Sequence, residues 1–339
     1  MESPRSPAVL QAEYSAPVEL TRLGSLRVSR LILGCGNFGG IGSAPAFHGL
    51  GETEAQAIEL MDRAWAAGIN AFDTADAYGG GRSESWIGRW LKAKGSSVRD
   101  RMVLTSKVFN PVGPGPDERG LSRAHILRQI DASLARLETD RLDLYLMHEW
   151  DPETPLEETL RAFDDLVRAG KVRHIGASNV TAEQLSRALG VSEQHGWAPL
   201  RCVQNSFSLL DRGAEPELFP ACAEHDVAFT AFSPLAGGWL TGKYHAGRPY
   251  PEGSRMTLRP EPYLHLSSER VFRGLAALEA AARERGVGTS TLALAWVLAQ
   301  PSVAAAVIGP RQPSHLEQAL AACEVRLTPD EAARLVKEF

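Results

Sequence analysis

Short apolar runs alternate with longer amphipathic segments along most of the chain. Each run is almost continuously apolar, which is typical of a strand that a parallel sheet buries on both faces. The longer segments place apolar residues at helical spacing, for example Ile126, Ile130 and Leu134. The pattern predicts eight strands, at residues 31–33, 70–74, 102–108, 142–148, 172–178, 201–205, 227–232 and 305–308.

The helices between these strands begin at recognisable capping residues. A Ser or Thr before an apolar-periodic segment, often with Gln or Glu three residues later, satisfies free amides of the first helical turn. The predicted capping residues are Thr53, Ser83, Ser122, Thr154, Thr181 and Thr328. The helices predicted without such a cap lie near 214–225 and 268–285, and at 289–299 and 314–322. Helix 289–299 is apolar on every face, which is typical of a buried helix.

Eight strand–helix units in one chain favour a closed barrel over an open, doubly wound sheet. We therefore predict the α/β class and a single (β/α)8 TIM barrel over residues 20–339. An N-terminal β-hairpin is predicted at 21–29, and residues 1–19 are predicted to be a flexible leader. After the seventh strand the alternation stops, and a long loop is predicted over 234–266.

The composition is that of an ordinary globular protein. The chain has 339 residues, of which 44% are hydrophobic and 23% charged, and its net charge is −5. This charge gives no reason to expect nucleic acid or an anionic membrane as a partner, and no apolar run is long enough for a transmembrane helix. Scattered cysteines and unclustered histidines predict a reducing, cytoplasmic compartment and no metal site.

Residues Gly34–Gly39 form a G-x-G-x-x-G pattern directly after a predicted strand. In a dinucleotide-binding Rossmann fold, a helix begins at the third glycine. Here the Gly and Pro residues of 40–45 disfavour a helix, and the next helix begins only at Thr53. The pattern is therefore interpreted as a Gly-rich loop at a strand end, and a Rossmann dehydrogenase is the less favoured alternative.

Four polar residues follow the C-terminal ends of three consecutive strands, namely Asp73, Tyr78, Lys107 and His148. Catalytic residues of a (β/α)8 barrel are expected at this end of the strands. Lys107 lies inside an apolar strand and needs a buried partner, which Asp73 can supply. The ammonium group is expected to lower the pKa of the Tyr78 phenol, which makes Tyr78 a candidate proton donor. A purely structural ion pair beside two loop residues is the alternative.

This set of groups indicates proton donation to a reacting oxygen. The imidazole can orient and polarise a carbonyl group. No Ser or Cys nucleophile is paired with His148 in a recognisable motif, so hydrolysis fits less well. A hydride supplied by a cofactor is therefore expected as the other reactant.

The segment from Phe72 to Glu84, FDTADAYGGGRSE, resembles the aldo-keto reductase family, and the resemblance covers the chain from about residue 20. The segment 233–244, SPLAGGWLTGKY, resembles the branch that includes potassium-channel β-subunits and bacterial reductases. The resemblance implies that the four polar residues form a catalytic tetrad. It also implies reduction of an aldehyde or ketone with hydride from NADPH and with Tyr78 as the proton donor.

The resemblance further implies where the cofactor binds. An aromatic residue at the end of the seventh strand, here Phe232, would stack on the nicotinamide. Arg311 would contact the adenosine 2′-phosphate, although His315 and Ala319 differ from the usual residues of that segment. The implied cofactor residues are Gly36, Asn37, Phe38, Asp73, Ser178, Asn179, Gln204, Phe232, Ser233, Leu235, Gly237, Gly309, Arg311, His315 and Gln318.

The sequence defines the substrate less well than the cofactor. His48, Trp150 and Trp239 lie in loops at the same end of the barrel and are candidates for the substrate pocket, with local packing as an equal alternative. A cofactor-binding regulatory subunit with little turnover is the alternative function. The identity of the carbonyl and the oligomeric state stay open, because specificity depends on the loops 40–52, 110–121 and 236–266.

Overall fold

A computed structural model of the protein describes residues 18–339, so most of the predicted leader, residues 1–17, lies outside the described range. Eight parallel strands close into a barrel in the order β10-β3-β4-β5-β6-β7-β8-β9. The predicted (β/α)8 barrel is therefore confirmed. Its strands are β3 (Leu31–Gly34), β4 (Ala71–Asp73), β5 (Val103–Val108), β6 (Leu142–Met147), β7 (Val172–Ser178), β8 (Leu200–Ser206), β9 (Ala228–Phe232) and β10 (Val303–Ile308).

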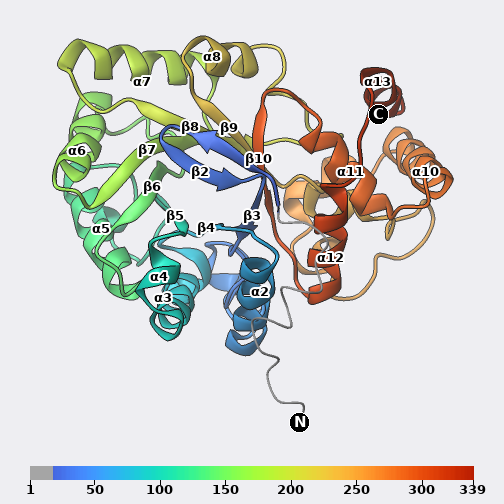
Figure 1. Cartoon of the computed structure of the whole chain (residues 1–339), viewed down its shortest axis with the longest axis horizontal. Helices are drawn as coiled ribbons and strands as arrows, with labels where there is room; N and C mark the ends of the chain where they lie inside the picture. Colours follow the sequence, from blue (N-terminus) through green and yellow to red (C-terminus); the bar gives the residue numbers. More distant parts are fainter. Residues whose placement is uncertain (1–17) are drawn as a thin grey trace.

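The helices form a layer around the outside of the barrel (Figure 1). Their apolar faces and the outer faces of the strands build the larger of two cores. The buried helix predicted at 289–299 is confirmed, since nine residues of α11 (Thr289–Leu298) are buried. The other helices are α2 (Glu54–Ala66), α3 (Arg82–Lys94), α4 (Ser96–Arg99), α5 (Arg123–Arg136), α6 (Leu156–Arg168), α7 (Ala182–His195), α8 (Leu218–Glu224), α9 (Arg255–Leu258), α10 (Glu269–Glu284), α12 (Pro313–Ala322) and α13 (Pro329–Lys337).

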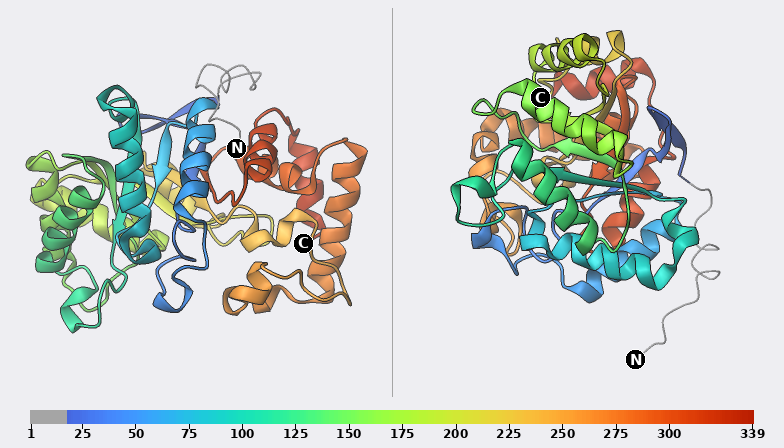
Figure 2. Two further views of the ribbon diagram at one scale, coloured as in Figure 1. Left: turned by 90° about the horizontal axis from the view of Figure 1, so that it is seen from below. Right: turned by 90° about the vertical axis from the view of Figure 1, so that its left-hand side faces the viewer.

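The predicted hairpin, β1 (Leu20–Leu23) and β2 (Leu26–Ser29), lies across one end of the barrel (Figure 1). Its side chains Leu23, Leu26 and Val28 join the second core, which fills the barrel interior. The long loops extend from the opposite end (Figure 2). Because the hairpin closes the N-terminal end of the strands, a functional cavity has to open at the C-terminal end. None of the helices within the described range is both long and apolar enough to cross a bilayer.

Two predicted helix caps are wrong. Helix α3 follows Gly81, while Ser83 lies inside the helix and donates its hydroxyl proton to the carbonyl oxygen of Cys35 (2.9 Å). Helix α6 follows Pro155, and the Thr154 hydroxyl donates to the Asp151 carboxylate (2.8 Å) without accepting a hydrogen bond from a helix amide. The capping boxes predicted from Thr53, Thr181 and Thr328 are present.

The segment after β9 contains more structure than its sequence predicts. It forms two short 3-10 helices, Ala236–Thr241 and Glu261–Leu266, with α9 between them. An aromatic cluster anchors the segment, because the Trp239 ring lies 5.0 Å from Tyr244 and 5.6 Å from Phe272 between centroids. Burial of these large rings stabilises the conformation without regular secondary structure.

Candidate active site

The strand ends bring the four predicted catalytic residues together. Asp73 is the last residue of β4, Lys107 lies near the end of the adjacent β5, and His148 directly follows β6. Tyr78 comes from the loop after β4. The three glycines that follow it, Gly79–Gly81, all have positive φ values (58°, 68° and 85°). A Cβ atom at Gly79 would lie 2.4 Å from the carbonyl oxygen of Phe38, so only glycine allows this close approach.

Asp73 and Lys107 form an ion pair that is shielded from water, with relative exposures of 3% and 1%. The Lys107 ammonium also donates to the carbonyl oxygen of Thr74 (3.0 Å). The second carboxylate oxygen of Asp73 accepts a hydrogen bond from the Gln204 amide (2.9 Å). Both carboxylate oxygens are therefore bound, and the position of the ammonium group is fixed.

The Tyr78 hydroxyl faces both the ammonium group and the imidazole. Its oxygen lies 3.3 Å from Nε2 of His148, and the two rings meet edge to face. The Lys107 Nζ atom lies 5.1 Å from the centroid of the Tyr78 ring. One hydroxyl proton thus lies next to a cation and a second hydrogen-bonding group, as a general acid requires.

Burial determines the protonation states of these groups. Burial raises the pKa of Tyr78, and Lys107 lowers it by a smaller amount, so the pKa lies above its ordinary value. Lys107 thus lowers the pKa of Tyr78 as the sequence predicts, but burial, which the sequence does not show, outweighs this effect. For Lys107, burial acts to lower the pKa, but Asp73 and Tyr78 outweigh it and the pKa is raised. Burial and Lys107 together hold the pKa of His148 well below its ordinary value. The site thus contains a protonated phenol, an ammonium ion and a neutral imidazole.

A cavity of about 580 Å³ extends from Tyr78 along the C-terminal ends of the strands. With the exception of Phe38, the cofactor residues implied by the sequence line this cavity. They are Gly36, Asn37, Asp73, Ser178, Asn179, Gln204, Phe232, Ser233, Leu235, Gly237, Gly309, Arg311, His315 and Gln318. Phe38 is 1% exposed and packs in the core instead. Residues that lie far apart in the sequence, at the ends of different strands, thus line one continuous site.

The predicted substrate residues lie apart from this lining. Trp239 is buried in the aromatic cluster after β9 and is not among the described residues that line the cavity, which favours local packing, the alternative given above. His48 packs against Gly80, and Trp150 is half-buried against the core. Neither His48 nor Trp150 is among the described residues that line the cavity.

One end of the cavity is lined by three cationic side chains, Lys243, Arg255 and Arg311. Burial and the two neighbouring guanidinium groups lower the pKa of Lys243. Glu52, whose side chain is 2% exposed, accepts a hydrogen bond from Nε of Arg311 (2.8 Å). Burial raises the pKa of Glu52 despite this partner. Three cations beside one carboxylate leave an excess of positive charge that suits an anionic ligand.

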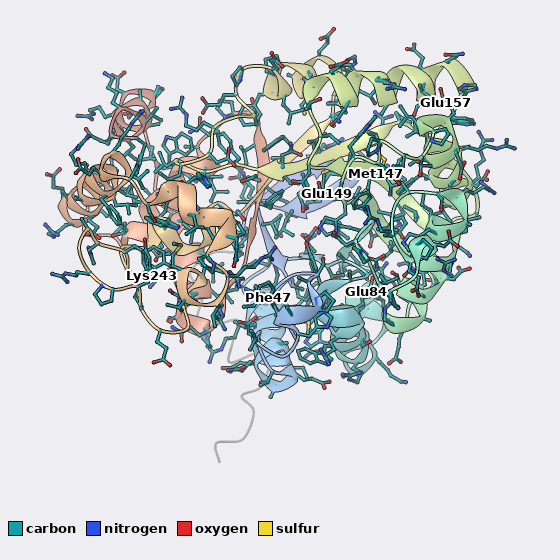
Figure 3. All side chains as sticks on the ribbon, turned by 180° about the vertical axis from the view of Figure 1, so that it is seen from behind. Phe47, Glu84, Met147, Glu149, Glu157 and Lys243 are labelled. Atoms are coloured by element: carbon teal, nitrogen blue, oxygen red, sulfur yellow. The ribbon has the colours of Figure 1, made fainter. Side chains whose placement is uncertain are left out.

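The sequence pattern did not identify Lys243 or Arg255 as site residues. Both belong to the long segment after β9, whose basic residues were noticeable but whose path could not be predicted. Arg255 forms a hydrogen bond to the Asn37 side chain, and Arg311 donates to the carbonyl oxygen of Gly253 (3.1 Å). Figure 3 labels Lys243 in this segment and Phe47 in the loop before α2. The segment therefore borders the cavity and contacts the first βα loop across it.

Comparison with known proteins agrees with this arrangement. The model described as "Aldo/keto reductase family" matches residues 30–337. The uncharacterized oxidoreductase YrpG of Bacillus subtilis (strain 168) is 39% identical, over 91% of this chain and 92% of its own. The versiconal hemiacetal acetate reductase of Aspergillus parasiticus is 33% identical, over 95% and 97%. A probable voltage-gated potassium channel subunit beta of Arabidopsis thaliana is 35% identical, over 77% and 80%.

Proposed function

Because the chain belongs to the aldo/keto reductase family and is an oxidoreductase enzyme, we propose that it reduces an aldehyde or ketone to an alcohol with NADPH. The observation that carries this proposal is the Tyr78 hydroxyl, which lies 3.3 Å from His148 and beside the Lys107 ammonium at the cavity. Tyr78 thus combines a retained proton with a neighbouring ammonium group and imidazole at the cavity.

The cavity supports NADPH as the cofactor. Polar side chains near the tetrad, Ser178, Asn179 and Gln204, would hold the nicotinamide carboxamide, and the half-buried Phe232 would offer a ring face for stacking. The cationic end would bind the phosphate groups, because paired Arg and Lys side chains favour multiply charged anions. At Gly237 a Cβ atom would lie 2.3 Å from the Tyr263 ring, so the cradle requires glycine there.

When bound, NADPH supplies a hydride to the carbonyl carbon. The residues of this chain then supply the proton and the electrostatic stabilisation. Tyr78 donates its proton to the carbonyl oxygen, while the neutral His148 hydrogen-bonds to the same oxygen. The Lys107 ammonium stabilises the phenolate left on Tyr78, and Asp73 keeps that ammonium in position. Reprotonation of Tyr78 from solvent completes the cycle.

A regulatory subunit that binds NADPH with little turnover is the second candidate, supported by the similarity to the channel subunit beta. The presence of all four tetrad side chains in one site favours the enzyme.

The two candidates differ in turnover. The assay follows NADPH absorbance with a panel of aldehydes and ketones. We expect the wild type to reduce some of these compounds, and we expect Tyr78→Phe to lower kcat by about 10²–10⁴-fold. The dissociation constant for NADPH, measured by quenching of Trp fluorescence, should stay nearly unchanged in the variant. If the wild type binds NADPH but reduces no carbonyl faster than Tyr78→Phe, the enzyme proposal fails and the regulatory candidate is favoured.

A further inference from the structure

Asn110 contacts the catalytic imidazole at the ring nitrogen that does not meet Tyr78, and it is not among the described residues that line the cavity. It follows β5, three positions after Lys107, and its Nδ2 atom lies 3.0 Å from Nδ1 of His148. We propose that Asn110 is a positioning residue, which holds His148 in the tautomer that has its proton on Nε2. This inference rests on the proposed carbonyl reduction, because it assigns a state to the imidazole of the same site.

The hydrogen-bonding chemistry of the two groups leads to this tautomer. An amide nitrogen only donates, so the Nδ1 atom that it faces must accept with its lone pair. Burial and Lys107 keep the imidazole neutral, and a neutral imidazole with a free Nδ1 lone pair has its proton on Nε2. Nε2 is the nitrogen that lies next to the Tyr78 hydroxyl and the cavity.

The tautomer determines what His148 does to its neighbours. With the proton on Nε2, the imidazole donates to the carbonyl oxygen and leaves the Tyr78 proton free for the same oxygen. With the proton on Nδ1, the Nε2 lone pair would accept the Tyr78 proton and would repel the lone pairs of the carbonyl oxygen. The first tautomer assists proton donation, and the second competes with it.

No other described side chain is within hydrogen-bond distance of Nδ1. The backbone of His148 has partners of its own, since its N–H donates to the carbonyl oxygen of Val108 (3.0 Å) and its carbonyl oxygen accepts a hydrogen bond from the Asn179 amide (2.9 Å). Removal of the Asn110 amide therefore leaves the backbone of His148 held while its tautomer is released. Tyr78 then becomes the main hydrogen-bonding neighbour of the ring and favours the wrong tautomer.

The tautomer can be measured without turnover. In protein with ¹⁵N-labelled histidine rings, two-bond ¹H–¹⁵N spectra at neutral pH distinguish a protonated Nε2 from a protonated Nδ1, and His148→Gln assigns the signal. We expect Nε2 to be protonated in the wild type and the Nδ1-protonated form to appear in Asn110→Leu. A wild type protonated on Nδ1, or a tautomer that is the same in Asn110→Leu, would overturn the proposal.

Kinetics supply the second half of the test. We expect Asn110→Leu to lower kcat for carbonyl reduction by about tenfold, while the NADPH dissociation constant changes less than twofold. Asn70→Leu is the matched control and should leave the His148 tautomer unchanged. Asn70 lies at the opposite end of the barrel, where its side chain forms hydrogen bonds with the backbone of Ser29 and Arg27. A changed tautomer with unchanged kcat would also overturn the proposal. Absence of any carbonyl reduction in the wild type would instead refute the proposed function, and the spectra would still report the tautomer.

Discussion

Replacing Asp73 with Asn should strongly destabilise the protein, because it leaves the Lys107 ammonium buried without a counterion. Lys107 is 1% exposed, and the acceptors that the structure gives it are Asp73 and the carbonyl oxygen of Thr74. Removal of one partner of such a buried pair lowers the free energy of unfolding by about 3–5 kcal/mol. This is a large part of the 5–15 kcal/mol that is typical of globular proteins, but the variant should still fold.

The loss of stability should depend on pH in a defined direction. In the wild type the pKa of Lys107 is raised, so the ion pair stabilises the fold at neutral pH and this contribution is lost as pH rises through that pKa. In Asp73→Asn the carboxylate is absent, so Tyr78 alone opposes the burial that lowers the pKa of Lys107. The difference in unfolding free energy between wild type and variant should therefore be largest near pH 7 and narrow toward pH 10, where the variant loses the charge.

Urea unfolding followed by circular dichroism at pH 7 and pH 10 measures both effects. Asp131→Asn is a matched control, since Asp131 pairs with Lys171 at the surface, where the two side chains are 61% and 38% exposed. The control should change the unfolding free energy by less than about 1 kcal/mol. A loss below about 1 kcal/mol in Asp73→Asn, equal at both pH values, would refute the view that the pair is buried and charged.

Other predictions concern the cofactor, the pH profile and the loop after β9. Glu52→Gln should tighten NADPH binding several-fold more than NADH binding, because it frees Arg311 from a carboxylate. Fluorescence titrations with both cofactors measure this difference, and equal effects on both would argue against a 2′-phosphate site at Arg311. The kcat/KM of reduction should show no inflection near pH 6.5, since the pKa of His148 lies well below that value, and an inflection there would show a charged imidazole in the free enzyme. Trp239→Ala should lower the free energy of unfolding, measured by urea denaturation, by about 3–5 kcal/mol and should leave the KM for the carbonyl unchanged. A raised KM without loss of stability would instead indicate that Trp239 contacts the substrate.

The barrel and the tetrad could be predicted because their signals are local. Each strand is a continuous apolar run, and a lysine within such a run, Lys107, requires a partner from a neighbouring strand. The C-terminal ends of successive parallel strands meet at one end of the barrel, so Asp73 and His148 follow from their positions in the chain. The structure brings these residues together as their order along the sequence suggested.

The parts that could not be predicted depend on tertiary contacts. The position of Arg255 beside Asn37 depends on the path of a long segment that an aromatic cluster anchors, and no periodicity encodes that path. The direction of the Tyr78 pKa shift depends on burial, which outweighs the neighbouring ammonium and is not visible in a sequence motif. The missed contact of Thr154 is local instead, because its hydroxyl donates to Asp151, which lies only three residues earlier in the chain.

The hairpin that closes the N-terminal end of the barrel also has a kinetic consequence. With Leu23, Leu26 and Val28 filling the interior from that side, two reactants have to enter and leave through the same opening. For the proposed reduction, the carbonyl and the cofactor would share this opening, and a cofactor lying along the strand ends would have to bind before the carbonyl and leave after the alcohol. Product inhibition patterns of an ordered bi-bi scheme would be the signature of that order.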